Sequence, residues 1–171
     1  MNMNGKEEDK SYRYTMSTFS VQIAGKGNGI HTIFNNMRDI SETINVPAEI
    51  IFKYIAAVTG SNYIPAKNTI TGAHTTEDLN KIILVYIKYL VMCPVCNIPE
   101  TVPEVEGSKK NTKLKLCCSA CKNVSYVTNA NKQIDKGIDI IIKYLNSGNL
   151  WKTSKGTMVQ ISNENEFNPF E

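Results

Sequence analysis

The sequence contains no apolar segment long enough to cross a membrane. Its longest uninterrupted apolar run, Ile82–Ile87, is far shorter than the ~20 residues that a spanning helix needs, and a lysine flanks it on each side. Residues 1–10 are polar and charged and have no apolar stretch of the kind found in signal peptides. We therefore expect a soluble, cytoplasmic protein with no membrane partner. Its 171 residues suffice for one ordinary domain or two small ones.

The motifs of a nucleotide site or a catalytic centre are also missing. No G-x-x-x-x-G-K-[S/T] phosphate-binding loop occurs, and the spacing G-x-G-x-G in Gly25–Gly29 differs from the dinucleotide fingerprint. The two histidines, His31 and His74, are far apart in the sequence, and no nucleophile–histidine pair or carboxylate pair is convincing. We therefore expect a protein without catalytic activity of its own.

Cysteine is scarce, but four of the five cysteines form two C-x-x-C pairs. Cys93 with Cys96 and Cys118 with Cys121 are separated by 21 residues that contain strand-like pieces. Two such turns can surround one Zn²⁺ with four sulfurs, which leaves no open position for catalysis. The alternative is a redox C-x-x-C, but that motif normally occurs once, beside a βαβ pattern. We predict a zinc ribbon with one structural Zn²⁺, and we expect Cys117 to be a small buried side chain rather than a fifth ligand.

Neither sign of charge predominates in the sequence. The formal net charge is +3, and four coordinated thiolates together with one Zn²⁺ lower it to about +1. Such a chain does not bind nucleic acid through its bulk charge. Any contact with RNA requires a local basic patch or a matching shape.

Hydrophobic periodicity predicts a mixed fold. Apolar residues alternate over 18–34, which predicts a hairpin with an exposed glycine-rich tip, and they recur at helical spacing over 76–92. The fold class is α+β: a small mixed α-β domain followed by a four-cysteine zinc ribbon and a C-terminal helix. The predicted parts are a flexible lead (1–10), the α-β domain (11–92), the ribbon (93–128), the helix (129–150) and a polar tail (151–171).

Two segments carry residues suited to contact other molecules. On the glycine-rich tip, main-chain N–H groups can approach phosphate closely, and Lys26, Asn28 and His31 add polar groups. A simple flexible turn is the alternative for this segment. Arg13 lies between two tyrosines, where it is either a solvated or ring-stacked arginine or a finger that enters another protein's active site. The local sequence leaves these alternatives open.

Taken in order, the motifs resemble the N-terminal part of eukaryotic translation initiation factor 5. The resemblance covers about residues 11–146, and its motifs are weak singly but specific in this order. They are Tyr12-Arg13-Tyr14-x-Met16, Gly25-Lys26-Gly27-Asn28-Gly29-Ile30-x-Thr32, Lys53-Tyr54, Cys93-Pro94-x-Cys96 after a helix, Pro99-Glu100-Thr101 and Cys118-x-Ala120-Cys121.

This resemblance implies an activator of GTP hydrolysis by initiation factor 2 during start-codon selection. The implied partners are the γ and β subunits of factor 2 with GTP, initiator methionyl-tRNA, the small ribosomal subunit and mRNA. Arg13 matches the family's finger-like arginine, and Lys53 matches a lysine that supports the activity. The glycine-rich loop is implied to lie near the anticodon arm of the initiator tRNA. The RNA-contacting residues are then Lys26, Gly27, Asn28, Gly29 and His31.

The chain departs from the family pattern in three places. His31 occupies the position of a second supporting lysine, and an imidazole is a weaker partner for phosphate than an ammonium group. Gln22 stands where a basic residue is often found. The family's C-terminal helical-repeat domain is missing, so we expect either a fragment or a shortened homologue. The ending Phe167–Glu171 is either a docking peptide or a disordered end.

Two other functions remain open at this point. The β subunit of initiation factor 2 shares this fold and ribbon, so the chain could be a structural component of that factor, although the Tyr12-Arg13-Tyr14 motif and the glycine-rich loop argue against it. A generic zinc-ribbon nucleic-acid-binding protein is the other alternative. The near-neutral charge of the zinc-bound chain argues against that function.

Overall fold

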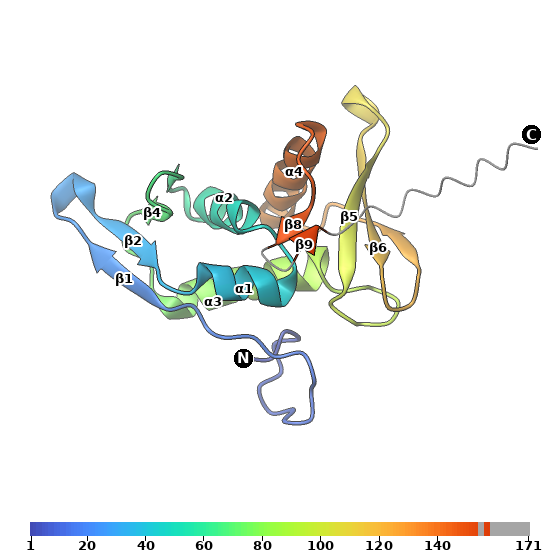
Figure 1. The fold of residues 1–171 in the computed structure, drawn as a ribbon, viewed down its shortest axis with the longest axis horizontal. Coiled ribbons are helices and arrows are strands. Elements are labelled where there is room, and N and C mark those ends of the chain that lie inside the picture. The colour runs from blue at the N-terminus through green and yellow to red at the C-terminus, as the bar shows by residue number, and fades with distance from the viewer. Residues whose placement is uncertain (154–155, 158–171) are drawn as a thin grey trace, which may run out of the picture.

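The computed structural model describes residues 1–153 and 156–157. Figure 1 shows a sheet at each end of the long axis, with helices between them and the N-terminal loop on one side. This mixed α-β architecture, with a small sheet that follows the first domain and a later helix, agrees with the predicted fold class.

The first sheet is antiparallel throughout. It has the strand order β1-β2-β4-β3 and consists of β1 (Val21–Ala24), β2 (His31–Phe34), β4 (Thr69–Thr71) and β3 (Tyr63–Ile64). The register pairs Val21 with Phe34 and Ala24 with His31, which confirms the predicted hairpin. The short helical turn Gly27–Gly29 forms its tip.

Side-chain caps and left-handed residues fix the ends of the helices. The hydroxyl of Thr75 accepts from the N–H of Asp78 at the start of α3, and Asn131 caps α4 in the same way. Gly60 ends α2 in the left-handed region. The four helices of the described chain are α1 (Met37–Ile44), α2 (Ala48–Thr59), α3 (Thr76–Leu90) and α4 (Lys132–Asn146).

The core forms where α2, α3 and α4 meet. The rings of Tyr54 on α2 and Tyr86 on α3 pack edge to face with centroids 4.9 Å apart, and both residues are fully buried. Gly137 on α4 faces this pair: a Cβ there would lie 2.8 Å from Leu90 Cδ1 and 3.3 Å from the Tyr54 ring. The absence of a side chain at this position thus lets α4 approach the other two helices closely.

The second sheet forms the ribbon and has the strand order β5-β6-β7. It contains β5 (Thr101–Glu106), β6 (Lys113–Cys118) and β7 (Val124–Tyr126), all antiparallel. Leu114 and Leu116 lie on its inner face, and Val102 and Leu114 belong to the same hydrophobic core as the helices. The ribbon is therefore packed onto the first domain rather than attached by a free linker.

Two segments near the chain ends pack more closely than their polar sequences indicated. Residues 1–10 belong to a closed loop, in which Met3 is buried and Asn2 pairs with Thr15. The polar tail predicted from residue 151 begins with a buried Trp151, whose indole N–H donates to the carbonyl of Asn45 at 2.8 Å. After it come β8 (Lys152–Thr153) and β9 (Gly156–Thr157). The possible docking peptide at 167–171 lies outside the described residues.

None of the helices in the described chain is both long and apolar enough to span a bilayer.

Candidate functional site

The four cysteines of the two C-x-x-C pairs meet at the base of the ribbon. All four sulfurs lie within 4.8 Å of one another, and the Cys93–Cys121 and Cys96–Cys118 Sγ distances are both 3.7 Å. A tetrahedral site with Zn–S bonds of about 2.3 Å requires S···S separations of about 3.8 Å. The cluster therefore has the size and the donor set that Zn²⁺ prefers.

The two turns that carry the cysteines have the same backbone geometry. Asn97 follows one pair and Lys122 follows the other, and both adopt a left-handed conformation, with φ of 57° and 64°. The N–H of Asn97 donates to the carbonyl of Cys93, and the N–H of Lys122 donates to that of Cys118. The backbone thus folds back in each turn, so that both sulfurs point to one centre.

The thiols differ in their readiness to ionise. Hydrogen bonds from the backbone and side-chain amides of Asn123 lower the pKa of Cys121 to about 6. The Nδ2 atom of Asn123 lies 3.3 Å from Cys121 Sγ. Desolvation instead raises the pKa of Cys96 to about 12. A divalent cation would favour the thiolate form of all four sulfurs and would release protons on binding.

Cys117 does not belong to the cluster. It neighbours Cys118 on β6, but successive strand residues point to opposite faces, and its sulfur is not among the four grouped atoms. Desolvation and the nearby Glu104 carboxylate raise its pKa to about 11, so its thiol stays protonated near neutral pH. Cys117 is half-buried rather than buried, and its exclusion from the metal-binding group agrees with the prediction.

Arg13 lies on the closed N-terminal loop, residues 1–16. The backbones of Met1 and Met16 exchange hydrogen bonds where the two ends of this loop meet. Within the loop, the side chains of Met3 and Met16 are buried. The Arg13 side chain is exposed and its guanidinium carbon lies 5.6 Å from the centre of the Tyr14 ring. Such an arrangement restricts the arginine without covering its hydrogen-bond donors.

The loop is tied to the cysteine cluster through one glutamate. The Tyr14 hydroxyl donates to Glu100 Oε1 at 3.2 Å, and Ser119, which lies between Cys118 and Cys121, donates to the Glu100 carbonyl at 2.9 Å from both its N–H and its hydroxyl. Sequence reasoning missed this link because Tyr14 and Glu100 are 86 residues apart.

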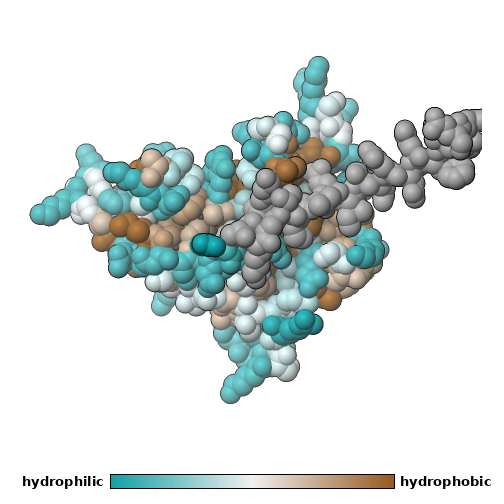
Figure 2. All heavy atoms as spheres, in the orientation of Figure 1, coloured by the Kyte–Doolittle hydropathy of each residue, from teal (hydrophilic) through white to brown (hydrophobic). Residues whose placement is uncertain are grey.

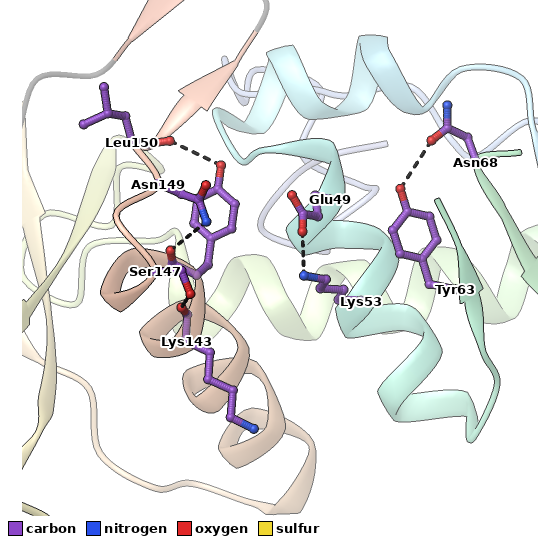
Figure 3. A network of polar contacts seen from close by, with 9 residues as sticks. Glu49, Lys53, Tyr63, Asn68, Lys143, Ser147, Asn149 and Leu150 are labelled. Atoms are coloured by element: carbon purple, nitrogen blue, oxygen red, sulfur yellow. Dashed lines mark hydrogen bonds and ion pairs between the residues drawn. The ribbon is translucent and has the colours of Figure 1, made fainter. Parts of the chain in front are cut away.

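Lys53 lies on the exposed face of α2 and pairs with Glu49, one helical turn earlier. Figure 3 shows it facing a hollow toward α4, across which lies Lys143. This hollow has a volume of about 310 Å³, and Ser147 and Asn149 line one side of it. Lys143 lay outside the residues singled out from the sequence, since only tertiary packing brings α4 beside α2.

The glycine-rich loop is exposed, as predicted. Gly25 has φ of +88°, and a Cβ there would lie 2.1 Å from the Gly29 carbonyl oxygen, so only glycine fits this turn. His31 Nδ1 lies 2.9 Å from the same oxygen. That contact holds the imidazole against the loop and leaves its Nε2 to face other molecules.

The structure brings the four cysteines together but separates the other predicted residues. In Figure 1 the glycine-rich hairpin and the ribbon lie at opposite ends of the long axis, and the N-terminal loop and α2 lie on opposite sides of α1 and α3. Arg13, Lys53 and the glycine-rich loop therefore cannot form one compact site.

A sequence comparison identifies the domain that contains these residues. The family described as a domain found in initiation factors 2B and 5 matches residues 4–124, which include Arg13, the glycine-rich loop, Lys53 and all four clustered cysteines. The chain belongs to this family. Helix α4 lies beyond the matched residues.

Individual relatives within this initiation-factor family bear the name predicted from the motifs. Eukaryotic translation initiation factor 5 of Drosophila melanogaster is 34% identical over 125 residues, which are 71% of this chain and 26% of the relative. The factor 5 protein of Phaseolus vulgaris is 35% identical over 132 residues, which are 75% of this chain and 29% of the relative. That of Zea mays is 36% identical over 129 residues, which are 73% of this chain and 28% of the relative. These comparisons confirm the predicted resemblance. The chain spans less than a third of the length of these relatives.

Proposed function

We propose that this chain is a translation initiation factor that stimulates GTP hydrolysis by initiation factor 2. The observation that carries the proposal is the placement of Arg13: it is exposed, stacked on Tyr14, and held on a closed loop that is tied to the cysteine cluster. A guanidinium presented in this way suits insertion into the nucleotide site of another protein. Membership of the initiation-factor family supports factor 2 with its γ and β subunits as the target.

In this mechanism the residues of the chain act by position and charge. Factor 2 supplies the nucleotide, and Arg13 stabilises the negative charge that develops on the transferring phosphoryl group. Lys53 supports the activity from another face, and Lys26 to Gly29 with His31 contact the initiator tRNA. Their separation on the surface suits a factor that touches several components at once, namely factor 2, the tRNA and the small ribosomal subunit with its mRNA in the cytoplasm.

The cysteine cluster supports this role without taking part in the reaction. Cys93, Cys96, Cys118 and Cys121 would hold one Zn²⁺, and four thiolates leave no position for a substrate. The ion would fix the turn that carries Ser119, and through Glu100 the loop that carries Arg13.

The proposal is tested by single-turnover GTP hydrolysis on reconstituted preinitiation complexes. The chain as it stands should accelerate phosphate release over complexes without it. If the chain binds the complex but does not accelerate hydrolysis, the proposal is overturned. That result would favour a structural component of factor 2, whose β subunit shares the predicted fold. Stable co-purification with the γ subunit in equal amounts would distinguish that second candidate.

The link from Tyr14 to Glu100 predicts a graded effect on activation. Tyr14→Phe keeps the ring beneath Arg13 but removes the donor to Glu100. Since one hydrogen bond contributes about 0.5–1.5 kcal/mol, we expect stimulation at saturating factor to fall about two- to tenfold, with unchanged affinity for the complex. Tyr12→Phe is the matched control, because the Tyr12 hydroxyl is buried and makes no hydrogen bond to any residue of the described chain. Equal losses in the two variants would contradict the predicted link.

A further inference from the structure

The outer half of the ribbon concentrates positive charge. Residues 107–122 contain five lysines and no aspartate or glutamate. Lys109 and Lys110 lie in the exposed turn Lys109–Asn111 that joins β5 to β6, and Lys113 opens β6. In Figure 1 this hairpin tip projects beyond the helices, and Figure 2 shows hydrophilic residues there.

Only part of this charge is neutralised within the chain. Lys115 pairs with Glu104 on the neighbouring strand, with Nζ and Oε2 3.3 Å apart. Glu106 accepts a hydrogen bond of 2.6 Å from the Tyr126 hydroxyl. The three lysines nearest the tip form no ion pair with any residue that the structure describes. A surplus of positive charge therefore remains at the tip.

An exposed aromatic ring adjoins these lysines. Tyr126 lies on the edge strand β7 and is 55% exposed. The register places it opposite Lys115, so both are on the outer face of the ribbon, and Lys113 Nζ lies 5.9 Å from the centre of its ring. The outer face thus combines ammonium groups with an accessible ring, whereas Leu114 and Leu116 fill the inner face.

We propose that Lys109, Lys110, Lys113 and Tyr126, here called the ribbon-tip surface, bind single-stranded RNA. The lysines would contact successive phosphates, and an unstacked base would lie on the Tyr126 ring. The accessible ring favours RNA over an acidic protein, because an acidic peptide needs the lysines but not the ring. The chain as a whole is near neutral once zinc is bound, so this contact is local.

The ribbon-tip surface is separate from the residues proposed to act in GTP hydrolysis. It lies at the opposite end of the molecule from the glycine-rich loop, so the two would contact different parts of an RNA or different RNAs. RNA binding by this surface does not require Arg13, so an RNA-binding assay without factor 2 tests it independently of GTP hydrolysis.

The test compares two triple variants of the zinc-bound chain by fluorescence anisotropy with a labelled oligouridine. Lys109→Gln/Lys110→Gln/Lys113→Gln should bind on the order of a hundredfold more weakly at about 50 mM salt. The slope of log affinity against log salt should fall by about 2, at ~0.7 per phosphate. Lys10→Gln/Lys67→Gln/Lys81→Gln removes the same charge from exposed positions elsewhere and should lower the affinity and slope much less. Equal effects of the two variants would overturn the proposal.

Substitutions of Tyr126 separate stacking from charge. Tyr126→Leu should weaken binding roughly fivefold with an unchanged salt slope, whereas Tyr126→Phe should retain affinity because it keeps the ring. No loss in Tyr126→Leu would overturn the stacking contact. A second titration uses labelled polyglutamate of equal charge. If the chain binds polyglutamate as tightly as oligouridine, the ribbon-tip surface is a site for acidic proteins instead. Bound zinc and circular dichroism confirm that each variant is folded.

Discussion

Arg13→Ala is expected to abolish most of the stimulation of GTP hydrolysis while leaving the factor folded and bound to its complex. An arginine supplied in trans contributes on the order of 10³–10⁵ in rate, because it places a fixed positive charge where the phosphoryl group becomes more negative. The side chain is exposed and lies against the Tyr14 ring at the surface, so its loss should barely change the free energy of unfolding. The measurement is the single-turnover rate as a function of factor concentration.

Two further variants make this result specific. Arg38→Ala removes the only other arginine of the chain, which is 83% exposed and pairs with Glu42 on α1, and it should stimulate like the unchanged chain. Arg13→Lys keeps the charge but not the planar fork of donors, so we expect it to restore only a small part of the rate. Full stimulation by Arg13→Ala at saturation would rule out the finger, and Lys53 would then be the next residue to test.

Elements with a strong local signal were predicted closely from the sequence. The β1–β2 hairpin follows from alternating apolar residues around a glycine turn, and α3 follows from its apolar spacing and the Thr75 cap. Each C-x-x-C turn sets the backbone geometry of its own pair of cysteines, and the antiparallel pairing of the adjacent strands β5 and β6 brings the two pairs together. In these cases neighbouring residues contain the physical cause.

Contacts between distant residues were not predictable in this way. Trp151 lies in a polar segment, yet it is buried in the hydrophobic core, where its N–H donates to the carbonyl of Asn45 at the end of α1. Nothing in the sequence near Tyr14 indicates Glu100 as its partner. The opposition of Lys53 and Lys143 across a hollow likewise depends on the close approach of α4, which Gly137 allows. The sequence indicates candidate residues, but their grouping depends on the packed fold.

Removal of the metal should have the largest effect on stability. Structural Zn²⁺ contributes about 10–16 kcal/mol of apparent binding free energy in small zinc modules, and in such modules this free energy maintains the fold. We therefore expect Cys118→Ser to lose bound zinc and to unfold the ribbon. Val102 and Leu114 join the ribbon to the main core, so the unfolding should also lower the melting temperature of the α-β domain.

Cys117→Ser is the matched control for this experiment. It lies next to Cys118 on the same strand but outside the sulfur cluster, so it should keep one zinc per chain. Substitution with Co²⁺ gives a direct spectroscopic check, since a tetrahedral four-thiolate site should form in the unchanged chain and in Cys117→Ser but not in Cys118→Ser. Because protons compete with the metal for the sulfurs, zinc should dissociate as the pH falls. A purified chain without zinc that instead forms reversible disulfides within each C-x-x-C pair would contradict the metal site and favour the redox alternative.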